Sequence, residues 1–84
     1  MYIVLVYDFD EARVSKINKL LKMYLIWVQN SVFEGEINQN LYDEMIKRVL
    51  GLMEEGDSVI IYKFRAKNEV KREIYGNNRD LNVI

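Results

Sequence analysis

The sequence predicts an α+β fold in one small domain. Short runs rich in β-branched and aromatic residues are typical of strands, and two longer stretches carry apolar residues at helical spacing. These segments follow one another in the order strand, helix, strand, strand, helix, strand. The chain has 84 residues, half of them apolar and none of them proline, which is the composition of a folded domain rather than of a disordered segment.

The first strand is expected over residues 2–7, with Asp8 at its end. Because side chains alternate along a strand, this strand has two faces, and both are apolar. A domain of this size has helices for only one face of its sheet, so we expect the other face to pack on a second copy of the chain. Asp8 lies at the end of that second face.

The first helix is expected to begin after Asp8 or Asp10, either of which can cap it. Its apolar stripe is predicted to be Val14, Ile17, Leu20, Leu21 and Tyr24. Four basic residues lie outside the stripe at three-residue spacing, so they can act together as one basic surface. They are Arg13, Lys16, Lys19 and Lys22.

Residues 26–37 return to a β pattern. Two short strands with a turn near Asn30 and one long bent strand both fit, because no Asn-Gly or Asp-Gly pair marks a hairpin. Gly35 indicates a bulge or a close approach of the backbone.

The second helix is expected to begin after Asn38 or Asn40 and to end at Gly56. Gly51 lies inside this helix, where glycine costs ~1 kcal/mol relative to alanine, so we expect close packing beneath it. The predicted apolar stripe is Leu41, Met45, Val49, Leu52 and Met53.

A strand over Ser58 to Phe64 follows, and Val70 to Tyr75 is predicted to form an additional C-terminal strand. The order β-α-β-β-α-β is the ferredoxin-like arrangement, an antiparallel sheet with two helices on one face. We expect the domain to cover residues 1–76, including the C-terminal strand. Residues 77–84 are expected to form a tail whose apolar end, Val83 and Ile84, docks on a neighbour.

The composition excludes several kinds of site. The chain has no Cys and no His, which rules out disulfides, thiolate or imidazole metal ligands and histidine catalysis. Carboxylates and other oxygen donors remain, and these suit a hard cation such as Mg²⁺. The apolar N-terminal run is far too short to span a membrane and has no basic leader, so we expect a cytoplasmic protein without membrane contact.

Charge is distributed unevenly along the chain. Residues 12–33 contain four basic residues and no acid, whereas residues 34–57 contain seven acids against Lys47 and Arg48. Such segregation can produce one positive face suited to phosphate, although two ordinary solvated helix faces would have the same pattern.

Three motifs make this chain resemble the second of the two core CRISPR spacer-acquisition proteins, the Cas-two family. The first is the apolar strand that ends in Tyr7-Asp8, and the second is Gln29-x-Ser31-Val32-Phe33-x-Gly35. The third is Glu55-Gly56-Asp57-Ser58-Val59, which leads into a strand ending at Tyr62. The resemblance covers nearly the whole chain. One departure is Trp27, where many members carry Arg; this Trp would stack or pack at the dimer interface instead of neutralising a phosphate.

The resemblance implies a homodimer whose sheets face each other, with Asp8 of each subunit meeting across the two-fold axis and binding Mg²⁺ or another divalent cation. Two carboxylates this close repel, and a cation between them relieves the repulsion. Such an ion also lowers the pKa of a bound water and so favours phosphodiester hydrolysis. The alternative for Asp8 is that it only caps the following helix.

Further site residues follow from the resemblance. Arg13, with the three lysines of the basic surface, would bind nucleic-acid phosphates. Tyr7, Ser31 and Phe33 are candidates for supporting the site, although Tyr7 and Phe33 also suit the core. Gln29 and Ser31 would either position a phosphate or bond strand ends.

Two functions are expected from the resemblance. The first is a scaffold for CRISPR adaptation that binds duplex DNA and an integrase partner during spacer acquisition, with metal-dependent endonuclease activity as an accompanying possibility. The alternative is a stand-alone Mg²⁺-dependent endoribonuclease or a toxin-type ribonuclease of the same fold, acting on RNA. A third hypothesis is an interaction domain with no nucleic-acid role, which the absence of any salt-sensitive DNA binding would support.

Overall fold

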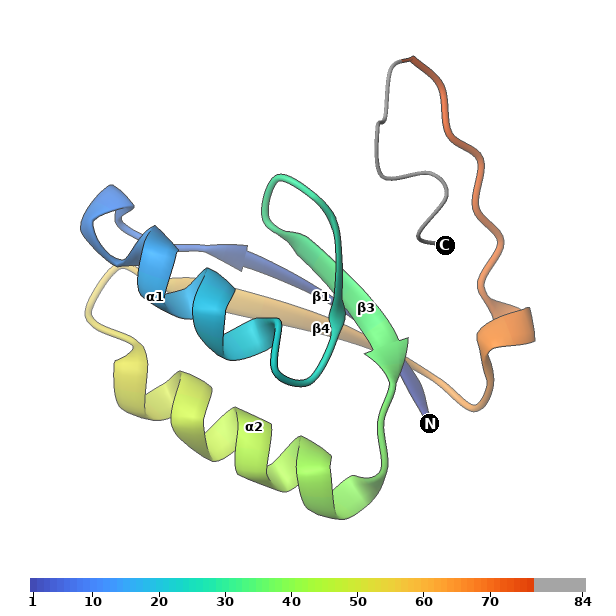
Figure 1. Ribbon diagram of the computed structural model, residues 1–84, viewed down its shortest axis with the longest axis horizontal. Coiled ribbons are helices and arrows are strands. Elements are labelled where there is room, and N and C mark those ends of the chain that lie inside the picture. Colours follow the sequence, from blue (N-terminus) through green and yellow to red (C-terminus); the bar gives the residue numbers. More distant parts are fainter. Residues whose placement is uncertain (77–84) are drawn as a thin grey trace.

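The computed structural model describes residues 1–76, so the predicted tail over residues 77–84 lies outside the described part. The elements are strands β1 (Tyr2–Asp8), β2 (Ile26–Gln29), β3 (Val32–Glu36) and β4 (Ser58–Phe64), helices α1 (Glu11–Leu21) and α2 (Gln39–Leu52), and a short 3₁₀ turn, η1 (Lys67–Glu69). Figure 1 shows both long helices together against the strands. The predicted α+β, ferredoxin-like order of elements is confirmed.

The four strands form one antiparallel sheet in the order β2-β3-β1-β4. The register places Val4 between Glu34 of β3 and Tyr62 of β4. At the other end of β1, Asp8 lies opposite Ser58, the first residue of β4. Residues that pair across neighbouring strands project to the same face of the sheet. Val4 and Asp8 therefore share one face with their partners Glu34, Tyr62 and Ser58, and this face is here called the open face.

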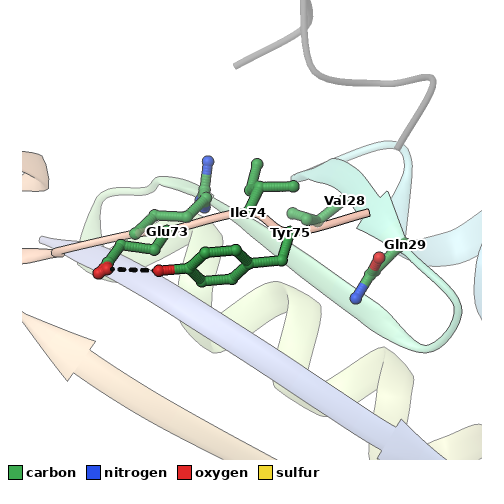
Figure 2. A pocket seen from close by; sticks show the side chains of 6 residues that line it. Val28, Gln29, Glu73, Ile74 and Tyr75 are labelled. Carbon is green, nitrogen blue, oxygen red and sulfur yellow. Dashed lines mark hydrogen bonds between the residues drawn. The ribbon is translucent and has the colours of Figure 1, made fainter. Parts of the chain in front are cut away.

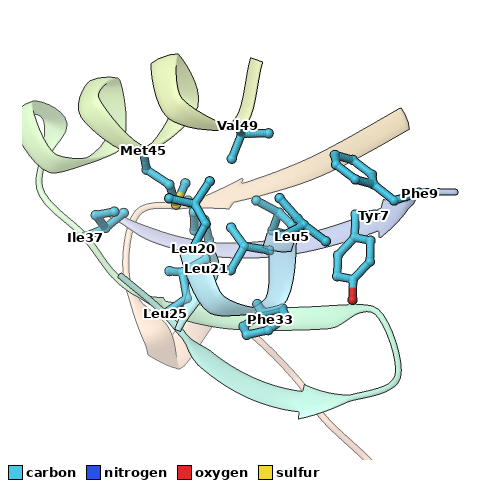
Figure 3. Close-up of a cluster of buried hydrophobic side chains, with 12 residues drawn as sticks. Leu5, Tyr7, Phe9, Leu20, Leu21, Leu25, Phe33, Ile37, Met45 and Val49 are labelled. Atoms are coloured by element: carbon cyan, nitrogen blue, oxygen red, sulfur yellow. The ribbon is translucent and has the colours of Figure 1, made fainter. Parts of the chain in front are cut away.

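The core lies between the sheet and the two helices. Figure 3 shows side chains from α1, α2, β1 and β3 pointing toward one another in this layer. Phe33 and Leu5, which pair between β3 and β1, are fully buried. This layer accounts for the apolar stripe of α1, for most of that of α2 and for one face of each central strand. The prediction is wrong for Leu41, which is 45% exposed, whereas Tyr42 and Ile46 pack against the core.

The helix boundaries resolve the alternatives left by the sequence. Asp10 caps α1 by accepting a hydrogen bond from the Ala12 amide at 2.9 Å. Asn38 caps α2 in the same way through the Leu41 amide at 2.8 Å. The positive φ expected at Gly56 is present, at 93°, but the expected helix end is wrong, because α2 ends at Leu52 and Gly56 lies in the following turn.

Residues 26–37 form two strands with a turn between them. Asn30 in this turn has a φ of 43°, a conformation that asparagine tolerates better than most residues. The close approach predicted at Gly35 is present, since a Cβ there would lie 3.3 Å from Leu25 Cδ2. The irregularity in strand pairing falls instead between Trp27 and Gln29.

The predicted C-terminal strand does not form within the single chain. Residues 70–75 alternate between half-buried and exposed side chains, as an extended segment would, but no ladder pairing is present. Arg72 of this segment forms an ion pair with Glu34 on the open face of the sheet. The segment therefore lies over the sheet face through side chains, whereas a fifth strand would have to pair along an edge.

Candidate active site

Asp8 lies at the end of β1, where the strand leaves the sheet. Its side chain is exposed, and it borders a polar pocket of about 230 Å³ formed by the β1–α1 and α2–β4 connections. Asp10, Glu55 and Asp57 also line this pocket. Among residues 1–76, no hydrogen bond or ion pair engages the Asp8 carboxylate, so it is available to a ligand.

The other carboxylates around the pocket differ in their availability. Asp10 caps α1, and the Asp57 carboxylate is turned into the protein, where its side chain is only 2% exposed. In the described part of the chain, no group of three or more Asp and Glu residues is arranged to hold a metal ion. Residues 1–76 of one chain therefore offer Asp8 as a hard oxygen donor but do not supply the remaining protein ligands.

Arg13 does not point to solvent with the lysines of α1. Its guanidinium donates to both carboxylate oxygens of Asp57, with contacts of 2.7 Å from Nη2 and 3.0 Å from Nε. A weaker contact of 3.6 Å joins Arg13 to Glu54. The expectation that Arg13 belongs to an exposed phosphate-binding surface therefore needs correction, since its planar fork is already satisfied within the chain.

Asp57 joins three segments that meet beside Asp8. Besides Arg13, it accepts hydrogen bonds from the backbone amides of Asp10 and Glu54, both at 3.0 Å. The hydrogen bonds from Arg13 are the main cause that lowers the pKa of Asp57 to about 2. Asp57 thus remains ionised and holds the start of α1 against the α2–β4 turn.

Lys16 and Lys19 are exposed on α1, and Lys22 is exposed at its C-cap. They lie outside the buried stripe of Ile17 and Leu20, as the spacing predicted. These three side chains form the α1 lysine surface. Long, solvated ammonium groups of this kind neutralise phosphates without reading sequence.

Tyr7 and Phe33 lie in the core rather than at the surface. Phe33 is fully buried, and the Tyr7 ring packs edge-on against Phe9 with ring centroids 5.6 Å apart. Ser31 lies in the β2–β3 turn, where its carbonyl accepts the Tyr7 amide at 3.1 Å. Any contribution of Tyr7 and Phe33 to the site is indirect, through the position of β1.

Gln29 and Trp27 lie away from Asp8. Gln29, at the end of β2, borders a second pocket with Val28 and the C-terminal segment, as Figure 2 shows. Trp27 lies on the helix side of the sheet and donates its indole N–H to the Asn30 carbonyl at 2.9 Å. Trp27 therefore packs partly against the core of its own chain, and its expected place at a dimer interface stays a prediction.

Sequence reasoning missed the role of Asp57. The signal was present, since Asp57 is the acid directly before β4 and Arg13 lies in the first turn of α1. Nothing in the local pattern pairs residues 44 positions apart, so only the fold brings them together.

Comparison with known proteins agrees with this arrangement. The family model described as CRISPR associated protein Cas2 matches residues 1–72. The chain belongs to the Cas2 family. A relative from Methanocaldococcus jannaschii, called CRISPR-associated endoribonuclease Cas2, is 46% identical over 77 residues, covering 90% of this chain and 68% of its own. The relative of the same description from Pyrococcus furiosus is 51% identical over 69 residues, covering 79% of each chain.

Solved Cas2 structures have the same fold. One described as the crystal structure of Cas2 superposes with a TM-score of 0.89 at 43% identity, covering 94% of this chain and 90% of its own. Streptococcus pyogenes Cas2 at pH 6.5 gives a TM-score of 0.80 at 25% identity, covering 90% of this chain and 100% of its own. Within residues 1–76, neither helix is both long and apolar enough to cross a bilayer; the cytoplasmic location stays a prediction.

Proposed function

We propose that this Cas2-family chain is a metal-dependent endoribonuclease in which Asp8 is the catalytic carboxylate. The observation that carries the proposal is the exposed carboxylate of Asp8 beside a polar pocket, which no side chain or backbone group of residues 1–76 engages, in a chain without His or Cys. The relatives called endoribonucleases support this function over the scaffold as the leading one. The reaction is hydrolysis of a phosphodiester bond in RNA.

The donor chemistry at Asp8 fits Mg²⁺, because a carboxylate is a ligand this hard cation prefers. When bound, Mg²⁺ would lower the pKa of a water ligand and offset charge on the phosphate. Asp8 would hold the ion, while the α1 lysine surface would attract the RNA backbone. One carboxylate supplies only a few of the oxygen ligands that a Mg²⁺ ion needs. The proposal therefore includes a second Asp8 from another copy of the chain.

The open face of the sheet supports this homodimer. Ile60 and Tyr62 of β4 are each 53% exposed there, next to half-buried Val4 and Val6 of β1. Apolar side chains of this size gathered on one face favour association. Pairing two open faces would cover these residues and bring the strand ends that carry Asp8 to a shared interface.

The test is cleavage of end-labelled single-stranded RNA in Mg²⁺ by the purified protein. We expect Asp8→Asn and EDTA each to reduce the rate by at least about 100-fold, since both remove the group that organises the metal. Binding of Mn²⁺, followed by electron paramagnetic resonance, should weaken in the same variant.

Asp10→Asn is the matched control. It removes a carboxylate two residues away, yet asparagine caps a helix about as well as aspartate, so cleavage should persist. Undiminished cleavage by Asp8→Asn, or cleavage that survives EDTA, would exclude Asp8 as the catalytic group.

The second candidate is the adaptation scaffold, which binds duplex DNA and an integrase partner. It is favoured by the exposed α1 lysine surface and by the absence, among residues 1–76, of a carboxylate group that could hold a metal by itself. Here Asp8→Asn would leave spacer acquisition intact while abolishing any cleavage. A toxin-type ribonuclease would instead be encoded away from CRISPR repeats and an integrase gene.

A further inference from the structure

Arg13 and Asp57 form the best-satisfied ion pair in the described part of the chain, and they lie beside the proposed catalytic carboxylate. Their side chains are 16% and 2% exposed, respectively. The Arg65–Glu69 pair at the far end of β4 is different, since the Arg65 side chain is 93% exposed. A sheltered bidentate pair is geometrically specific, whereas an exposed pair adds little.

Asp57 is connected to both strand ends at Asp8, to one by a hydrogen bond and to the other along the chain. Asp57 accepts the amide of Asp10, which is two residues beyond Asp8 on the same segment. It also directly precedes Ser58, the residue that pairs with Asp8 across the β1–β4 ladder. Both strand ends that determine the position of Asp8 are therefore tied to the same residue, the β1 end through its carboxylate and the β4 end through its backbone.

We propose that Arg13 and Asp57 are positioning residues that hold the Asp8 segment in its productive place. This proposal rests on the proposed function of Asp8. It assigns Arg13 to the alignment of the catalytic carboxylate and not to phosphate binding. The Arg13–Asp57 pair is here called the clamp. A misplacement of about 1 Å in a catalytic group can reduce a rate on the order of 100-fold, so loss of the clamp is expected to lower kcat.

The experiment measures kcat and KM for RNA cleavage in Arg13→Gln, Asp57→Asn and the double variant. We expect each single variant to lower kcat by about 10- to 100-fold with KM nearly unchanged. The double variant should be no slower than the worse single variant, because both substitutions break one unit. Arg13→Lys should be intermediate, since lysine retains the charge but not the planar fork.

Two further variants make the comparison specific. Glu69→Gln removes an ion-paired carboxylate at the opposite end of β4 and should leave both constants unchanged. Lys16→Gln should raise KM without lowering kcat, because Lys16 belongs to the α1 lysine surface. All variants are compared as folded proteins of the wild-type oligomeric state, well below their melting temperatures.

The phosphate-binding role for Arg13 predicts the opposite pattern. In that case Arg13→Gln would raise KM with kcat intact and would reduce the salt dependence of binding by about one counterion, whereas Asp57→Asn would retain full kcat. Either result would overturn the positioning role.

A second measurement tests the clamp independently of catalysis. Hydrogen exchange at the Phe9, Asp10 and Glu11 amides should be faster in Arg13→Gln and Asp57→Asn than in the wild type or Glu69→Gln. If the wild type does not cleave RNA, the proposed function fails, and this measurement alone decides the clamp. Unchanged exchange at these amides would refute it.

Discussion

Three aspartates near the end of β1 have different tasks because they have different partners. Asp8 is exposed and unengaged in the described residues, Asp10 accepts one backbone amide, and Asp57 accepts a guanidinium and two amides. The number of hydrogen bonds decides which carboxylate is held and which is available to a ligand. Asp57 accepts the most hydrogen bonds and has a structural role. Asp8 is the carboxylate that can bind a metal ion or a substrate.

The pKa of Asp57 leads to a prediction about stability in acid. The pKa of Asp57 is about 2 in the folded protein and about 4 in the unfolded chain. Ionised Asp57 therefore stabilises the fold fully above about pH 4. This contribution is lost as the pH falls through about 2. Asp57→Asn should therefore be less stable than the wild type at neutral pH, and the difference should shrink between about pH 4 and pH 2.

Urea denaturation of both proteins at a series of pH values measures this difference. Acid titration of the remaining carboxylates affects both proteins and cancels in the comparison. A difference that stays constant down to pH 2 would contradict the assignment of Asp57 as the group responsible.

At the scale of elements, α2 contains a glycine that nothing in the described structure requires. Gly51 is exposed, and a Cβ built there would have no other atom within 4 Å. The close packing expected beneath Gly51 is therefore absent, and the expectation is wrong. Glycine in a helix loses more conformational entropy on folding than alanine does.

Gly51→Ala should consequently stabilise the protein, by about 0.5–1 kcal/mol in the free energy of unfolding. Gly35→Ala is the control, because its new methyl would lie 3.3 Å from Leu25 Cδ2 and should bring no such gain. Both are measured by the midpoint of urea denaturation. A loss of stability in Gly51→Ala would show that the position is packed in solution.

The C-terminal segment shows how one face of the sheet is divided. Glu34 of β3 is buried between the Tyr2 hydroxyl, which donates to it at 2.5 Å, and the Arg72 guanidinium. Burial first, and then this hydrogen bond, raises the pKa of Tyr2 to about 12, so Tyr2 stays protonated at neutral pH. The segment thus covers the β3 side of the open face and leaves the β4 side uncovered.

At the scale of the whole molecule, the uncovered side is where we expect the second copy. Ile60→Glu places a charge within the apolar patch of β4, so it should convert a dimer into a monomer. Sedimentation velocity measures the change in mass. Leu50→Glu is the control, since Leu50 is 62% exposed on α2 and lies on the helix side. A wild-type monomer, or an Ile60→Glu dimer, would contradict this interface.

The sequence by itself determined the order of the elements, the buried stripe of α1 and the positions of the first strand and of the strand over residues 58–64. These follow from local spacing, because the period of apolar residues reports which face of each element is covered. The motifs that end at Asp8 and run through Phe33 also identified the family before any fold was known. The alternation of Val70, Arg72 and Ile74 gave the faces of the C-terminal segment, but the strand predicted from it does not form in the described chain.

Only the tertiary structure decided how side chains far apart in the sequence are used. In the fold, Arg13 pairs with Asp57, Phe33 is fully buried in the core, and Trp27 packs on the helix side of the sheet. The fold also lays the C-terminal segment on Glu34 instead of along a strand edge. The physical reason is that periodicity specifies a face but not a partner, and the partner of a charge depends on which segments the fold brings within hydrogen-bonding distance.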